Sequence, residues 1–260
     1  SFESGTIRRR RRPRWVRRTY HLYCRWIAPN PTRAALGVLT TTDSPRHSRF
    51  LVMAALVAAG EMVFALPFVV ARVFRPTLLD VFGLTNFELG TAFSVYGVVA
   101  MASYFPGGPL ADRFSARNLM TAALVATSLG GGLFAAIPSR GPLTALYAFW
   151  GLTTILLFWA ALMRATREWG GEAAIGRAYG ILDGGRGLSA ALLASIMVLI
   201  FAVLLPTDVA SATLAQRTAA LSSVIWIFTA LTVGSAALVW FAVPAGSPQA
   251  MDGPQFTWRG

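Results

Sequence analysis

The 260-residue sequence contains one cysteine and no lysine. The single Cys24 excludes an internal disulfide framework, and the two histidines have no cysteine partners at the spacing of a zinc site, so no metal site is expected. Charged residues make up 13% of the chain, against about 25% in a typical soluble domain, while hydrophobic residues make up 55%. This composition indicates a membrane protein.

The sequence also lacks the motifs of common hydrolytic and nucleotide-dependent enzymes. It has no Gly-x-Ser-x-Gly elbow, no His-Glu-x-x-His pair and no phosphate-binding loop. No apolar run contains a pair of carboxylates that could share acid and base roles. We therefore expect neither enzyme activity nor a cofactor.

Basic charge is concentrated at the N-terminal end of the sequence. All 23 basic residues are arginines, and 12 of them lie within residues 1–49 against two acidic residues. Such an arm can bind nucleic acid or anionic lipid, and residues 14–27 could form a basic amphipathic helix on a membrane surface. We favour a disordered cytoplasmic arm over 1–49 that orients the chain, and we do not expect nucleic acid as a partner.

Six apolar runs follow the arm, and each is long enough to cross a hydrocarbon core about 30 Å thick. Pro67 is expected to kink the first of them. The predicted fold class is an all-α integral membrane protein, in which a cytoplasmic tail or the start of a central linker follows over 244–260. Transmembrane helices are predicted over about 50–73, 88–111, 118–138, 143–164, 180–205 and 219–243.

A short charged hinge between the second and third runs has the most specific pattern in the sequence. It reads Gly-Gly-Pro-Leu-Ala-Asp-Arg-Phe-Ser-Ala-Arg-Asn-Leu-Met over residues 107–120. The major facilitator superfamily of secondary transporters has Gly-x-Leu-Ala-Asp-Arg-x-Gly-Arg-Lys-x-x-Leu between its second and third helices. The hinge resembles this pattern at Gly108, Leu110, Ala111, Asp112, Arg113 and the basic Arg117. It departs from the pattern at Ser115, Ala116 and Met120.

This resemblance implies a fold and a function for residues 50–243. They would form the N-terminal six-helix half of a transporter that moves a small solute by alternating access, as a symporter or an antiporter in the inner membrane. The six runs would then need a partner, either a second six-helix half or a copy of the same chain. The alternative is a membrane-anchored protein that does not transport and whose arginine-rich arm binds nucleic acid or anionic lipid.

The distribution of arginine predicts the orientation of the chain. With six spans, both termini lie on the side of the hinge. That side has 18 arginines and the other side has four, when Arg186 is left out as intrahelical. The positive-inside rule therefore predicts that both termini and the hinge are cytoplasmic.

Three charged residues in and after the first run are candidates for binding a solute or a proton. Glu61 lies at mid-span, where desolvation favours a protonated carboxyl that could exchange a proton, although a hydrogen-bonded helix contact is an equal alternative. On a continuous helix, Arg72 would lie about 20° from Glu61 around the axis and about 16 Å along it. Arg75 would lie about 40° away in the other direction. Either arginine could bind an anion or extend to the membrane surface.

Asp183 and Arg186 are three residues apart and are predicted to form an ion pair on a helix. The glycine-rich segment 176–187 around them resembles the start of the fifth helix in the same superfamily. Arg186 would close a cytoplasmic gate with Asp112 or Asp183, face the solute, or lie at the membrane surface. The predicted gating group is Gly108, Asp112, Arg113, Arg117 and Asp183.

Overall fold

The computed structural model describes residues 46–206 and 212–245. Almost all of the arm predicted over 1–49 and most of the tail predicted over 244–260 lie outside these residues, so both assignments stay predictions. The described residues belong to the second of two units of the chain, Arg46–Gly260. That unit is described by itself below.

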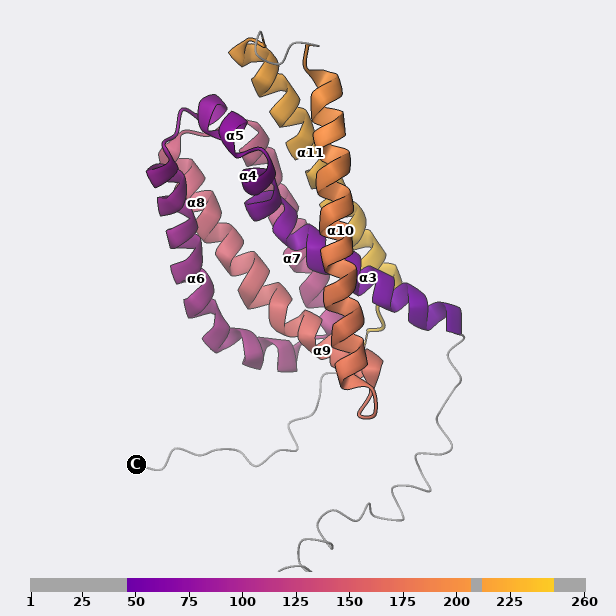
Figure 1. Ribbon diagram of the computed structural model, residues 1–260. Helices are drawn as coiled ribbons and strands as arrows, with labels where there is room; N and C mark the ends of the chain where they lie inside the picture. The colour runs from indigo at the N-terminus through magenta and orange to yellow at the C-terminus, as the bar shows by residue number, and fades with distance from the viewer. Residues whose placement is uncertain (1–45, 207–211, 246–260) are drawn as a thin grey trace, which may run out of the picture. The chain divides into compact units, whose positions relative to one another are not determined.

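Six helical segments of this unit are long and apolar enough to cross a membrane, which confirms the predicted fold class. They are drawn in Figure 1. The first span comprises α3 (Arg46–Phe64), the π-helix η1 (Ala65–Val69) and α4 (Val70–Val73), and the short α5 (Arg75–Phe82) follows it. The second and third spans are α6 (Asn86–Arg113) and α7 (Ala116–Ala135). The fourth span comprises α8 (Arg140–Gly151), the π-helix η2 (Leu152–Trp159) and α9 (Ala160–Gly170). The fifth and sixth spans are α10 (Ile175–Leu204) and α11 (Leu214–Ala242).

Capping residues set where several of these helices begin. Thr85 forms a capping box with Glu88 at the start of α6, and Thr213 forms one with Gln216 at the start of α11. Each box satisfies backbone N–H groups that have no partner within the helix. The sixth helix therefore begins at Leu214, ahead of the apolar run predicted from 219. Glu88 and Arg217 consequently lie in the first turns of spanning helices.

Two spans contain π-helical segments instead of continuous α-helix. Pro67 lies inside η1, where it cannot donate a backbone hydrogen bond, and its own carbonyl accepts a bond from the Tyr147 hydroxyl at 3.0 Å. The segment η2 contains no proline. Because π-helical turns are frequent at functional sites, the residues around both segments are candidates for a functional site.

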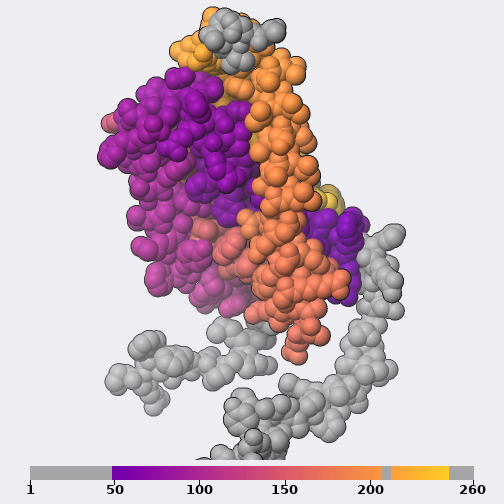
Figure 2. All heavy atoms as spheres, in the orientation of Figure 1, coloured from indigo at the N-terminus to yellow at the C-terminus, as the bar shows by residue number. Residues whose placement is uncertain are grey.

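The helices pack in a defined order of neighbours. The second span contacts the fourth, the fourth contacts α7, α7 contacts α11, α11 contacts α3, and α3 contacts α10. The two ends of this series, α6 and α10, are the least covered. Only 6% of the most apolar stretch of α10 is buried within the described structure, against 72% of the corresponding stretch of the first span. Figure 2 shows α10 as an exposed column.

Glycines and satisfied polar groups allow the close packing of α7. Gly131 packs against Thr229 of α11 and Leu66 of the first span. A Cβ added to Gly131 would clash with the Thr229 hydroxyl and would lie 2.9 Å from Leu66 Cδ1. One turn before Gly131, the hydroxyls of Thr127 and Thr153 of the fourth span are 2.8 Å apart. Trp150 Nε1 donates to the Thr127 carbonyl at 3.1 Å. Such internal hydrogen bonds are needed where no water is present.

We predict that Gly131→Ala lowers the free energy of unfolding by about 1–3 kcal/mol, because the new methyl group overpacks the contact with α11. The control is Gly132→Ala, whose Cβ would meet only Trp226 at an ordinary 3.7 Å. It should be neutral or stabilising by up to about 1 kcal/mol, because alanine favours helix more than glycine does. Thermal unfolding of the purified variants in detergent measures both. Equal stability of the two variants would contradict the packing described here.

Candidate functional site

A pocket of about 330 Å³ lies between the first span and α10. We call it the transport pocket, because residues predicted from the sequence to bind a solute or a proton line it. Its charged lining residues are Glu61, Arg72, Asp183 and Arg186, all of which were singled out from the sequence. Its remaining lining residues are Phe64, Phe68, Val69, Gly187 and Ala190. Residues more than 100 positions apart in the sequence therefore meet around one cavity.

Glu61 contributes a buried carboxylate to the transport pocket. The residue is only 7% exposed, yet it forms no ion pair within 4.0 Å in the part of the chain that the structure describes. A carboxyl group in this position is costly to ionise, because burial removes the water that would solvate the charge.

Arg186 is held at the boundary between α3 and α10. Its Nε donates to the carbonyl of Gly60 at 3.1 Å, and its Nη1 lies 3.6 Å from Asp183 Oδ1. The predicted ion pair with Asp183 is thus present. The guanidinium carbon also lies 5.7 Å and 5.6 Å from the ring centroids of Phe64 and Trp159, within the range of cation–π attraction.

Glycine at position 60 leaves room for the Arg186 side chain. A Cβ added to Gly60 would lie 2.9 Å from Arg186 Cδ, and one added to Gly185 would lie 2.8 Å from a Val57 methyl carbon. The two glycines therefore let α10 approach α3 closely at the depth of Glu61. This approach brings Arg186 to the transport pocket.

Arg72 and Arg75 have different surroundings. Arg72 is exposed and lines the transport pocket. Arg75 begins the separate helix α5, and its Nε donates to Asn86 Oδ1 at 2.9 Å. The angle predicted for Arg75 assumed a continuous helix, whereas η1 and the break at Phe74 interrupt it. Arg75 is therefore not part of the pocket lining.

The hinge lines a second pocket of about 240 Å³ at the end of α6. Gly108 and Asp112 face it together with Arg164 and Arg167. Asp112 and Arg113 are exposed. Their proposed gating roles remain predictions.

Arg117 is directed towards α11. Its guanidinium carbon lies 4.5 Å from the ring centroid of Trp240, so the last base of the hinge binds an aromatic ring. Of the two gate partners considered for Arg186, Asp183 is within ion-pair distance, whereas Asp112 lines the second pocket.

The sequence model of the Major Facilitator Superfamily matches residues 50–254. The chain belongs to this superfamily. It is similar to the Inner membrane protein YqcE of Escherichia coli (strain K12), with 27% identity over 76% of this chain and 44% of that protein. It is also similar to the Inner membrane protein YihN of the same strain, with 28% identity over 51% of this chain and 31% of that protein.

A further relative is the Uncharacterized protein MG294 homolog of Mycoplasma pneumoniae (strain ATCC 29342 / M129 / Subtype 1), with 30% identity over 43% of this chain and 25% of that protein. The chain spans less than half the length of these three relatives. No solved structure matches the chain. Superfamily membership and the six spanning helices identify it as an integral membrane protein of a transporter family.

Arg164 of the fourth span binds the superfamily hinge, a role that no motif in the sequence indicated. Arg164 is buried and donates hydrogen bonds to the carbonyls of Ala111 and Phe114, the latter at 2.8 Å. Its Nε lies 3.4 Å from Glu168 Oε1. The last carbonyls of a helix have no partner within the helix and carry negative partial charge, so an arginine is well suited to bind them. In the sequence, Arg164 is marked only by its four-residue spacing from Glu168, which is typical of an ion pair on a helix.

We predict that Arg164→Gln destabilises the protein by about 1–3 kcal/mol, because it leaves the buried carbonyl of Ala111 and the partly buried carbonyl of Phe114 without a charged donor. Arg167→Gln is the matched control, since Arg167 is exposed on the same helix. Hydrogen exchange should become faster in residues 111–118 of the Arg164 variant alone. Unchanged exchange there would show that Arg164 does not hold the hinge.

Proposed function

We propose that this chain is one six-helix half of a secondary active transporter of the inner membrane, which moves a small anionic solute coupled to protons. The observation that carries the proposal is the transport pocket, where Glu61, Arg72 and Arg186 from two spans surround one cavity. Ionisable residues within membrane spans are costly, and they commonly mark substrate or proton pathways. Membership of a transporter superfamily supports the same conclusion.

The lining charges favour an anion when Glu61 is protonated. With all four groups ionised, Arg72 and Arg186 are balanced by Glu61 and Asp183. Protonation of Glu61 leaves the pocket with net positive charge, which attracts an anion. Arg72 is exposed to the cavity and can bind a carboxylate or phosphate through two parallel hydrogen bonds. Anion binding and proton binding would therefore assist each other.

A partner half is part of the proposal. In transporters of this kind the solute site lies between two structural repeats, and transport is a rocking of one against the other. The poorly covered α6 and α10 support such an arrangement. The partner would be a second six-helix unit or a copy of this chain. The excess of arginine on one side supports cytoplasmic termini and hinge.

The alternative, a membrane anchor whose basic arm binds nucleic acid or lipid, is not favoured. The superfamily match covers residues 50–254, and the transport pocket also lies outside the arm. Transport that persists after removal of residues 1–45 would agree with this assignment.

Reconstitution tests the proposed function. The purified 260-residue chain is placed in liposomes, its mass is measured in detergent, and uptake of radiolabelled inorganic phosphate, sulfate and short carboxylates is followed. We expect binding without uptake by the isolated half, and uptake after addition of a second half. A stable monomer that accumulates one of these anions would contradict the two-half arrangement.

We predict that Arg72→Gln weakens anion binding by the purified chain about tenfold or more, since a charge-assisted pair in the pocket is lost. Arg75→Gln is the control, because this arginine donates to Asn86 instead of lining the pocket. Isothermal titration with the best-binding anion of the panel measures both affinities. Equal losses in the two variants would exclude a specific role for Arg72.

We predict that Glu61→Gln removes the pH dependence of anion binding. In the unmodified protein, affinity should rise as the pH falls, because protonated Glu61 no longer opposes the anion. The glutamine variant mimics the protonated carboxyl and should bind tightly at every pH, whereas the exposed control Glu172→Gln should behave like the unmodified protein. If the pH profile of the Glu61 variant is unchanged, this carboxylate is structural and another group provides the coupling.

A further inference from the structure

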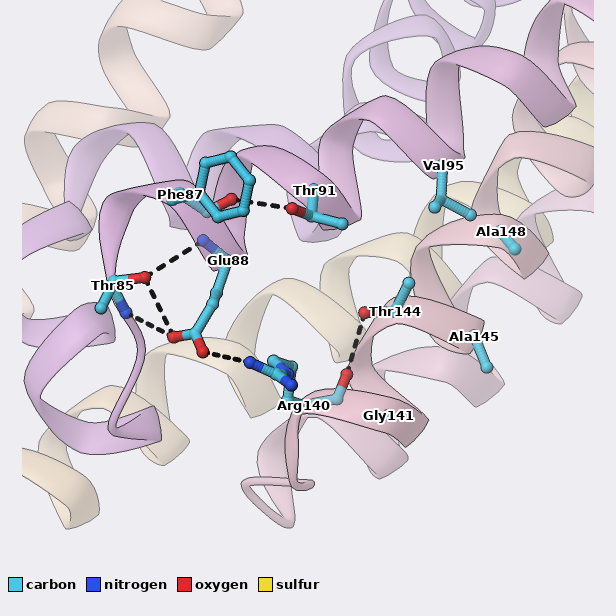
Figure 3. Close-up of a pocket in the computed structure, with 10 residues that line it drawn as sticks. All are labelled: Thr85, Phe87, Glu88, Thr91, Val95, Arg140, Gly141, Thr144, Ala145 and Ala148. Atoms are coloured by element: carbon cyan, nitrogen blue, oxygen red, sulfur yellow. Dashed lines mark hydrogen bonds and ion pairs between the residues drawn. The ribbon is translucent and has the colours of Figure 1, made fainter.

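A groove of about 750 Å³ runs between α6 and α8 on a different face from the transport pocket. Thr91 and Val95 line it from α6. Phe93, on the opposite side of the same helix, contacts Phe68 of the transport pocket with ring centroids 5.6 Å apart. The groove therefore opens away from the transport pocket. It begins at the first turns of α6 and α8, the end of α6 remote from the hinge (Figure 3).

An ion pair marks the mouth of this groove. Arg140 of α8 bonds the Glu88 carboxylate of α6. Glu88 also accepts hydrogen bonds from the backbone N–H and the hydroxyl of Thr85, at 2.8 and 3.0 Å. The carboxylate oxygens of Glu88 therefore have most of their hydrogen bonds within the chain. The Arg140 side chain is 67% exposed and has five N–H donors. The mouth of the groove therefore offers hydrogen-bond donors to an anion.

The start of α8 adds to this preference for an anion. Ser139 precedes the helix without forming a side-chain cap. The first N–H groups of a helix have no partner within the helix, and they favour negative charge. Arg140 and Gly141 lie in this first turn and both line the groove.

The walls beyond the mouth are apolar. The hydroxyls of Thr91 and Thr144 donate to carbonyls of their own helices, each at 2.9 Å, so their methyl groups remain for a ligand. Val95, Ala145 and Ala148 line the deeper part, which Figure 3 shows as small side chains. From Glu88 to Val95 the groove extends about 10 Å along α6, from the end of the span into its apolar part. A polar solute would find no partner there.

We propose that this groove binds a phospholipid, with the phosphate held by Arg140 and one acyl chain lying between α6 and α8. The cavity volume falls in the range of about 300–1,000 Å³ that small-molecule sites occupy. An exposed arginine, paired with Glu88 at the end of the spans, and apolar walls leading inwards match an amphiphile whose charge lies at the membrane surface. A free phosphate would use the mouth but leave the apolar walls unoccupied.

Native mass spectrometry tests the proposal on the purified 260-residue chain in detergent, with palmitoyl-oleoyl phosphatidylglycerol as the probe. We expect one tightly retained phospholipid. Arg140→Gln should weaken its retention about tenfold or more, because a charge-assisted contact is lost. The control Arg217→Gln should retain the lipid, since Arg217 forms a comparable ion pair with Asp80 at 3.1 Å but does not line the groove.

A second variant tests the groove without disturbing the ion pair. Ala148→Phe fills the apolar part and should lower lipid retention at least as much, whereas Ala122→Phe, at an exposed position of α7, should not. Both variants should keep the size-exclusion profile of the unmodified protein. Retention that is insensitive to Arg140→Gln and Ala148→Phe would overturn the proposal. Equal competition by inorganic phosphate would assign the mouth to a free anion instead.

Discussion

The contact of Arg186 with the carbonyl of Gly60 is the interaction on which the transport pocket depends. It exists because glycine leaves room for the arginine stem, and because α10 approaches α3 at that depth. An arginine at the centre of a membrane span costs about 2.5–3.5 kcal/mol on insertion scales unless it finds partners. Here a carbonyl, the carboxylate of Asp183 and two aromatic rings surround it.

Two aromatic residues near Arg186 and its cavity belong to the π-helical segments. Phe68 of η1 lines the transport pocket, and Trp159 ends η2 beside Arg186. A π-helical turn changes the direction in which later side chains point, so residues on either side of it no longer follow the 3.6-residue period. Phe64 and Phe68 of the first span both line the cavity. Glu61 precedes η1 and Arg72 follows it, yet both reach the same cavity.

Local sequence patterns predicted the six spans, the superfamily and the Asp183–Arg186 pair, because length, apolar runs and short spacings determine them. The position of Arg75 was not predicted from its spacing to Glu61, because that spacing assumes a continuous helix, whereas a new helix with Pro76 in its first turn begins after Phe74. The role of Arg164 was also missed, because its acceptors are backbone carbonyls 50 or more positions away. Backbone acceptors leave no mark in a sequence. For the same reason, the sequence did not predict that Arg186 binds the backbone carbonyl of Gly60.

Ion pairs and charge-assisted hydrogen bonds join neighbouring helices at both ends of the unit. Away from the hinge, Glu88 pairs with Arg140 and Asp80 pairs with Arg217, which join α6 to α8 and α5 to α11. At the hinge, Arg164 binds the end of α6. By contrast, α10 is joined to α3 mainly through small residues and one arginine that has several weak partners. Interfaces of small residues permit helices to slide with little change in packing. In the proposed transport cycle, movement would therefore cost least along α10, the helix that contributes Asp183 and Arg186 to the transport pocket.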